Sequence, residues 1–235
     1  SAIGPGRCDS VARRMWLRWL VALAVLAGLL PVGVGHAAEP LILDGRDPHT
    51  LLDPHPSVGA VYAEIGRAHG LPVEPLQLEQ RFRTAFASRC TRPRTNESAE
   101  RVFWRDLVDE VFAPWAGAAQ MERLFPDLWE AFAQPGRWRP RGALPSLFGT
   151  LRARGLKVAI LSNWDSRLHR VVAGHGWREW LDHVFVSADL GVEKPAHAIF
   201  TYAATALGCR PDEILHVGDS WDHDVAGALA AGWHA

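Results

Sequence analysis

The stretch ILHVGDSWDHDVAGALAAG, residues 214–232, decides the fold class. An apolar strand is predicted over residues 214–217, the turn Gly218-Asp219-Ser220 follows it, and helical spacing continues over residues 221–231. The same alternation extends upstream, with predicted helices at 144–154, 167–174 and 195–207 and predicted strands at 156–161 and 183–186. Strands and helices that alternate in this way predict an α/β fold with a parallel, doubly wound, Rossmann-like sheet.

Polar side chains follow the predicted strands. The first of these strands is an apolar run, Leu41–Leu43, which precedes the others in the chain. Ligands bind outside the carboxyl ends of the strands in an open parallel sheet, so residues at these ends are candidates for one shared site. In chain order they are a carboxylate, a hydroxyl with an amide, a lysine and a carboxylate pair: Asp44, Ser162, Asn163, Lys194, Asp219 and Asp224.

This order of side chains suits phosphoryl transfer. A carboxylate can attack phosphorus and form an acyl phosphate, which makes Asp44 the candidate nucleophile. A hydroxyl with neighbouring amides can hold a phosphoryl oxygen, so Ser162 and Asn163 are candidates for substrate binding. Lys194 would neutralise charge on the nucleophile and on the phosphoryl group, and it is therefore both a catalytic and a substrate-binding candidate.

Magnesium is the predicted cofactor. Gathered carboxylates repel one another unless a hard cation joins them, so Asp44, Asp219 and Asp224 are the candidate metal ligands. Zinc is not predicted, because the three cysteines of the chain lack the spacing of metal ligands. No GxxxxGK[ST] loop is present, which excludes nucleotide hydrolysis of the P-loop kind.

Three of these segments resemble the haloacid dehalogenase-like hydrolase superfamily. VAILSN (158–163) resembles its second motif, EKPAHAIF (193–200) its third, and HVGDSWDHDVAGALAAG (216–232) its fourth. The segment at 50–71 resembles the start of the cap in one branch of the superfamily, and the whole resemblance covers residues 41–235. It implies that the helical block 57–137 is a C1-type cap that closes over the site and selects the substrate. It also implies magnesium at Asp44 and Asp219.

The first motif departs from the pattern of the superfamily, which places threonine four residues after the nucleophile. Counting back four residues from Thr50 leads to Arg46, which cannot be a carboxylate nucleophile. A two-residue insertion, Pro48-His49, instead keeps Asp44 at the end of its strand. The position two residues after Asp44 then holds Arg46 rather than aspartate, so a general acid is missing unless Asp47 supplies it.

The predicted function is therefore a magnesium-dependent phosphatase that acts on a small phosphate monoester through an aspartyl-phosphate intermediate. One alternative is a catalytically impaired relative that binds a ligand on the same fold, because the first motif is degenerate. Another is a 2-haloacid dehalogenase. Such dehalogenases resemble Ser-Ser-Asn at the fourth motif, whereas Gly218-Asp219-Ser220 favours magnesium and phosphate.

Residues 1–39 differ in composition from the rest of the chain. Basic residues precede an uncharged run at 19–35, and small residues follow it, which is typical of a secretory signal peptide. The alternative is a non-native leader. Export or membrane anchoring is expected if the leader is native, with membrane contact only through an uncleaved leader, whereas the family resemblance favours the cytoplasm.

The remaining sequence predicts one hydrolase core with an inserted cap. The core is expected over 40–56 and 138–235, and its last strand looks truncated because the chain ends where a further strand should begin. The chain has 235 residues, 48% of them hydrophobic, and a net charge of −1. It can therefore fill a core, and it lacks the basic excess of nucleic-acid-binding proteins. The expected partner is a small phosphorylated substrate, with no nucleic acid.

Overall fold

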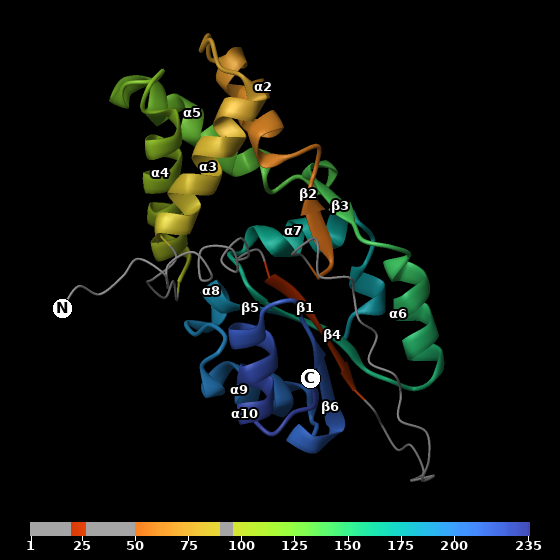
Figure 1. Cartoon of the computed structure of the whole chain (residues 1–235). Coiled ribbons are helices and arrows are strands. Elements are labelled where there is room, and N and C mark those ends of the chain that lie inside the picture. The colour runs from red at the N-terminus through yellow and green to blue at the C-terminus, as the bar shows by residue number, and fades with distance from the viewer. Residues whose placement is uncertain (1–19, 27–49, 90–95) are drawn as a thin grey trace, which may run out of the picture.

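A computed structural model describes residues 20–26, 50–89 and 96–235 of the chain (Figure 1). The described part holds a four-stranded sheet in the order β5-β4-β1-β6 and a two-stranded sheet of β2 and β3. The strands are β1 (Leu20–Leu26), β2 (Leu52–Pro54), β3 (Trp138–Pro140), β4 (Val158–Asn163), β5 (His183–Val186) and β6 (Ile214–Val217).

Helices cover both faces of the larger sheet. Val158 and Ile160 of β4 pack in one core cluster with α6 (Leu144–Ala153) and α7 (Arg167–Gly174). The alternate residues of β4 pack in a second cluster with α9 (His197–Leu207) and α10 (Gly227–Ala230). Side chains alternate between the faces of a strand, so β4 is buried on both sides. The predicted doubly wound α/β fold is therefore confirmed.

One strand of the sheet runs in an unexpected direction. β4 and β5 are parallel, whereas β1 pairs antiparallel with both β4 and β6, so β4, β5 and β6 share one direction and β1 opposes them. β1 comes from the apolar run at 19–35, and a short uncharged run suits a strand at the centre of a sheet. The predicted strand Leu41–Leu43 and its Asp44 lie outside the described residues. The signal-peptide interpretation of residues 1–39 stays a prediction.

The described residues between β2 and β3 form four α-helices and a 3₁₀ turn. The helices are α2 (Val58–Ala68), α3 (Pro75–Arg89), α4 (Glu97–Phe112) and α5 (Ala118–Ala131). Ser57 begins α2 and Asn96 begins α4, each accepting a hydrogen bond from a backbone amide three residues on, as N-cap residues do. Their buried aromatic side chains pack edge to face, for example Tyr62 against Phe82 at 5.8 Å between ring centroids. The helical prediction for this segment agrees with the structure, and its role as a cap stays a prediction.

The remaining elements are short. They are α8 (Ser187–Leu190), the 3₁₀ turns Pro135–Arg137, Arg178–Trp180 and Pro211–Glu213, and a π-helical turn at Trp221–Ala226. The predicted helix at 221–231 is thus a π-helical turn that continues into α10. Beyond Gly232 the chain returns to the sheet, where His234 forms a parallel bridge with Leu215 of β6. Within the part of the chain that the structure describes, no helix has the length and apolar character needed to cross a membrane.

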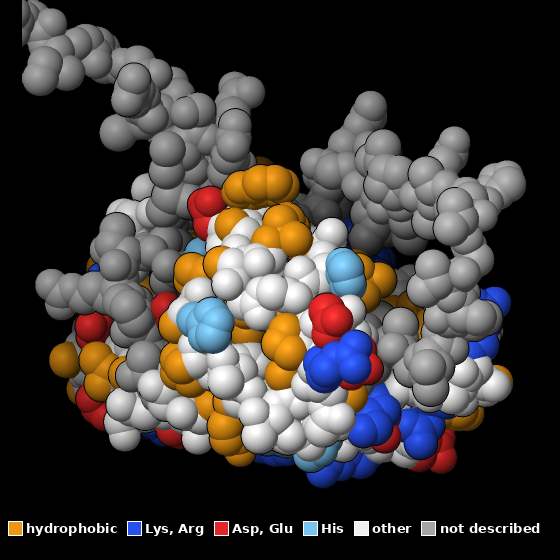
Figure 2. All heavy atoms as spheres, turned by 90° about the horizontal axis from the view of Figure 1, so that it is seen from below, with side chains coloured by type: hydrophobic (Ala, Val, Ile, Leu, Met, Phe, Trp, Pro, Cys, Tyr) orange, Lys and Arg blue, Asp and Glu red, His pale blue; other side chains and the backbone are white. Residues whose placement is uncertain are grey.

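The face of the molecule in Figure 2 carries charges of both signs. Lys and Arg side chains lie beside Asp and Glu side chains on this face. Pairs of this kind are common at the surface, as with Arg210 and Asp212 at 3.0 Å. The expectation that nucleic acid is not a partner stays a prediction.

Candidate functional site

The end of β4 holds the loop that carries Lys194. Asn163 is buried, its Nδ2 donates to the carbonyl of Lys194 at 2.9 Å, and its Oδ1 accepts from the backbone amide of Lys194 at 2.8 Å. Ser162 precedes it in the strand and is fully buried. The side-chain amide of Asn163 therefore positions the backbone of Lys194. The contact of Ser162 and Asn163 with substrate stays a prediction.

The ammonium group of Lys194 is completely buried. Its Nζ donates to the carbonyl of Leu161 at 3.0 Å and to Oδ1 of Asp224 at 2.5 Å. A buried charge is tolerated only when it is paired and hydrogen-bonded. The structure therefore brings two of the sequence-predicted residues together as an ion pair in which both side chains have zero exposure.

Asp224 has partners at both carboxylate oxygens. Oδ1 also lies 3.0 Å from Nε2 of His216, and Oδ2 accepts from the backbone amide of Ser220 at 3.0 Å. Burial alone would raise the pKa of Asp224, but Lys194 and His216 together hold that pKa well below its usual range. The carboxylate is fully buried and already accepts from three donors, and its predicted role as a metal ligand stays a prediction.

Asp219 is the second acidic side chain of the site. It follows β6, and the hydroxyl of Thr50 donates a short hydrogen bond to its Oδ1. Burial raises the pKa of Asp219, and the nearby charge of Asp224 raises it further. A nearby cation would favour the ionised carboxylate, so Asp219 fits a hard metal such as magnesium. Among the described residues no three His, Cys, Asp or Glu side chains form a ready metal site, and Asp44 lies outside that set.

His216 is a site residue that sequence reasoning missed. It lies in β6, two residues before Gly218, and its side chain is buried at 2% exposure. Burial lowers the pKa of His216, although its hydrogen bond to Asp224 acts in the opposite direction. The available signal was a histidine at a core-facing position of an otherwise apolar strand.

Gly218 leaves the space that Asp224 occupies. A Cβ atom at residue 218 would lie 2.2 Å from Cγ of Asp224, which is far inside van der Waals contact. We expect Gly218→Ala to displace the carboxylate and to lower the free energy of unfolding by about 1–3 kcal/mol. Thermal and urea unfolding measure this loss. Gly136→Ala is the control, because a Cβ there meets no atom within 4 Å, and equal losses in the two variants would contradict the expectation.

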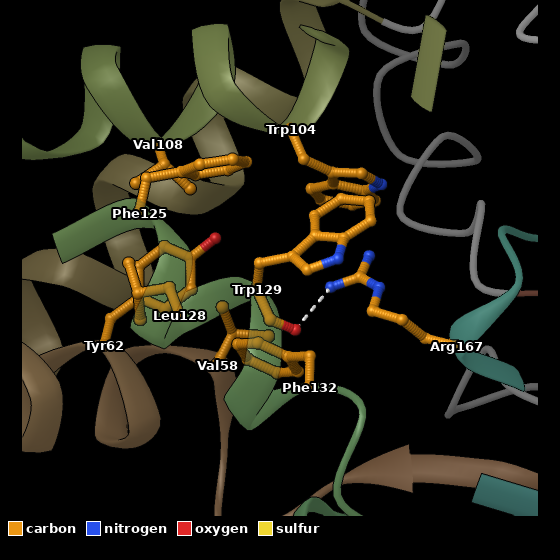
Figure 3. Close-up of a pocket in the computed structure, with 9 residues that line it drawn as sticks. All are labelled: Val58, Tyr62, Trp104, Val108, Phe125, Leu128, Trp129, Phe132 and Arg167. Carbon is orange, nitrogen blue, oxygen red and sulfur yellow. Dashed lines mark hydrogen bonds between the residues drawn. The ribbon is translucent and has the colours of Figure 1, made fainter. Parts of the chain in front are cut away.

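A small apolar cavity lies among the helices between β2 and β3 and reaches Arg167 of α7 (Figure 3). Its volume is about 20 Å³, room for about one water molecule. Arg167 lies 3.6 Å from the ring centroid of Trp129, and its Nη1 donates to the Trp129 carbonyl at 3.2 Å. Two further bonds of 2.7 Å join the guanidinium to the buried carboxylate of Asp165. Arg167 thus connects the loop after β4 to α5.

Comparisons with known proteins identify the family. A family model described as haloacid dehalogenase-like hydrolase matches residues 50–232. The chain therefore belongs to the haloacid dehalogenase-like hydrolases.

Two relatives show where in the family the chain is placed. Haloacid dehalogenase-like hydrolase domain-containing protein 3 of Mus musculus is 35% identical over 210 residues, which cover 86% of this chain and 83% of the relative. It represents the branch whose cap start residues 50–71 resemble, and that resemblance is confirmed. The phosphoserine phosphatase of Thermus thermophilus is 31% identical over 217 residues, covering 83% of this chain and 86% of that protein.

Solved structures support the fold alone, because their sequences are distant. YfnB of Bacillus subtilis, solved with bound magnesium, matches with a TM-score of 0.57 and 19% identity over 78% of this chain and 82% of its own. A dehalogenase solved as an intermediate complex matches with a TM-score of 0.51 and 19% identity over 78% of each chain.

Proposed function

We propose that this chain is a magnesium-dependent phosphatase that hydrolyses a small phosphate monoester. The observation that carries the proposal is the buried ammonium of Lys194, which bonds the Leu161 carbonyl of β4 and the carboxylate of Asp224. A fixed cation in a low-dielectric site stabilises negative charge on a phosphoryl group more strongly than it would in water. The named activity of the Thermus thermophilus relative supports the same class of substrate.

Each site residue has a role in this proposal. Asp44 attacks phosphorus, the ester bond between phosphorus and oxygen breaks, and the leaving alcohol takes a proton from Asp47 or from water. Water then attacks phosphorus in the aspartyl phosphate, which releases inorganic phosphate and restores Asp44. Ser162 and Asn163, the last two residues of β4, hold phosphoryl oxygens, and Lys194 neutralises their charge.

Magnesium would be held chiefly by Asp44 and Asp219. Asp219 fits this role because its carboxylate is partly buried, and its described hydrogen bond comes from a neutral hydroxyl, that of Thr50. Asp224 is the weaker candidate ligand, because it is fully buried and already accepts from Lys194, His216 and the Ser220 amide. When bound, magnesium supplies positive charge that offsets the charge on the phosphoryl oxygens.

A second candidate function is supported by the direction of β1. Leu20–Leu26 occupies the centre of the sheet between β4 and β6 and runs against them, so its carboxyl end lies at the edge opposite Ser162 and Asp219. A strand in this position cannot deliver a nucleophile to the site from its carboxyl end. This arrangement favours a relative that binds a phosphate-bearing ligand without turnover.

Hydrolysis of p-nitrophenyl phosphate by the full chain, with and without magnesium, tests the proposal. We expect magnesium-dependent release of p-nitrophenol, and Asp44→Asn is expected to lower kcat by about 1,000-fold or more because an amide is a poor nucleophile. Circular dichroism checks that the variant is folded. Turnover that survives in Asp44→Asn contradicts the assignment of the nucleophile. Phosphate binding without turnover in the wild-type chain supports the binding protein instead.

A further inference from the structure

His216 is placed to control how Asp224 and Lys194 interact. Its Nε2 lies 3.0 Å from Oδ1 of Asp224, and its ring packs edge to face with Phe200 at 5.8 Å and with Trp233 at 5.9 Å between centroids. A carboxylate is an acceptor only, so Nε2 carries the proton of this bond. Nδ1 is buried and has no hydrogen-bond partner within the described ranges. Among the described residues, the hydrogen bond to Asp224 is therefore the polar interaction of the His216 imidazole.

The carboxylate of Asp224 is bound by donors on both sides. Oδ1 accepts from Lys194 and His216, while Oδ2 accepts from the backbone amide of Ser220. Lys194 therefore bonds one oxygen of the carboxylate, Oδ1, while Oδ2 bonds the Ser220 amide. This arrangement also divides the charge on Oδ1 between two donors.

One N–H donor of the Lys194 ammonium has no partner among the described residues. A lysine ammonium has three N–H donors. In the described part of the chain one of them goes to Asp224 Oδ1 at 2.5 Å and one to the Leu161 carbonyl at 3.0 Å. The third has no partner in that part of the chain, and because the side chain has zero exposure, a phosphoryl oxygen would reach it only where the packing over the ammonium opens. Removing the imidazole donor would leave Lys194 as the single side-chain donor to a buried carboxylate, which would then attract the ammonium more strongly.

We propose that His216 is a positioning residue that shares the Asp224 carboxylate and so keeps one N–H of Lys194 available to a phosphoryl oxygen. The proposal rests on the role of Lys194 in the proposed function. It concerns the binding of an oxyanion, however, and can be measured without turnover.

The lysine content of the chain provides a direct measurement. Lys157 and Lys194 are the two lysines of the sequence, so lysine labelled with carbon-13 at Cε gives two resolvable signals in the full-length chain. Titration with inorganic phosphate is expected to shift the Lys194 signal and to leave that of Lys157 in place. His216→Phe, which keeps an aromatic ring between Phe200 and Trp233, is expected to raise the Kd for phosphate about tenfold.

Two amide variants separate positioning from packing. The amide nitrogen of His216→Gln can reach the place of Nε2 and donate to Asp224, whereas that of His216→Asn is too short. We expect His216→Gln to return the Kd to within about threefold of wild type and His216→Asn to behave like His216→Phe. If His216→Phe does not fold, the comparison of His216→Gln with His216→Asn tests the proposal in its place. Equal affinities of His216→Gln and His216→Asn would overturn the proposal.

His175→Phe is the matched control. His175 is another imidazole with a buried, unpartnered ring nitrogen among the described residues, and it stacks on Trp177 at 5.0 Å. Its replacement is expected to leave the phosphate Kd unchanged, and a rise equal to that of His216→Phe would overturn the proposal. A wild-type chain that binds phosphate but does not turn over defeats the proposed function and leaves this inference standing. A wild-type chain that binds no phosphate overturns both.

Discussion

Replacing Lys194 with methionine is expected to lower the free energy of unfolding by about 3–5 kcal/mol at neutral pH. Both side chains of the Lys194–Asp224 pair have zero exposure, so the substitution leaves a buried carboxylate without its cation. His216 and the Ser220 amide remain as neutral donors, and they do not replace the lost charge. Urea unfolding followed by tryptophan fluorescence measures the change.

The other lysine supplies the control for this prediction. Lys157 is exposed, and its Nζ donates to the Leu207 carbonyl, so Lys157→Met should cost only about 0.5–1.5 kcal/mol. If both methionine variants lost a similar free energy of unfolding, the buried Lys194–Asp224 pair would not be the cause of the effect.

The effect of Lys194→Met should depend on pH. In the folded wild-type chain the pKa of Asp224 is held below its ordinary value, so the pair stabilises the fold above about pH 4. That contribution is lost as the pH falls through the lowered pKa. The stability difference between wild type and variant is therefore expected to narrow on acidification, and a constant difference from pH 7 to pH 3 would contradict this account.

Replacing Arg167 with methionine is expected to have a comparably large effect, about 3–5 kcal/mol. The guanidinium bonds Asp165 through two nitrogens, and Asp165 is fully buried. The variant leaves that carboxylate unpaired and removes the cation that stacks on Trp129 at 3.6 Å from the ring centroid.

Arg170→Met, on the same helix, is the comparison for Arg167→Met. Arg170 pairs with Glu130, but each side chain is 54% exposed, so the expected loss is at most about 1 kcal/mol. Both variants remove an arginine that joins α7 to α5. Differential scanning calorimetry of the two is the measurement, and an Arg170→Met loss as large as that of Arg167→Met would show that burial is not the cause.

The alternation of strands and helices was predictable because each strand is a short apolar run that ends at a turn. The structure reproduces the predicted bounds at 183–186 and 167–174. The predicted strand at 156–161 lies two residues further along the chain, at Val158–Asn163, because Ser162 and Asn163 continue the strand instead of ending it. Asn163 is tolerated in a buried strand because the backbone of Lys194 satisfies its amide. That partner lies 31 residues away, and no local pattern identifies it.

The central strand could not be predicted for a similar reason. The apolar run at 19–35 and the run Leu41–Leu43 both meet the local requirements of a buried strand. Which of them pairs with β4 depends on contacts distant in sequence, and the structure places Leu20–Leu26 there.

The spacing of Asp219 and Asp224 identified both as site residues, but it did not show that their carboxylates have different hydrogen-bond partners. Asp219 and Asp224 look equivalent in the sequence. In the structure Asp219 accepts from Thr50, whereas Asp224 is committed to Lys194, His216 and the Ser220 amide. Sequence spacing places carboxylates near one another, but it does not show which oxygens already have partners.

Because β2 pairs with β3, the two ends of the helical segment α2 to α5 lie next to each other. Leu52 lies opposite Pro140, and Asp53 bonds Arg141 at 2.9 Å, so the chain leaves the core and returns to it at one place. A graft of the corresponding segment from a relative would join the recipient chain at this one junction, and its α5 would also need to contact Arg167 and Arg170 of α7. Transplanting α2 to α5 as a unit would therefore leave the connectivity of the larger sheet unchanged.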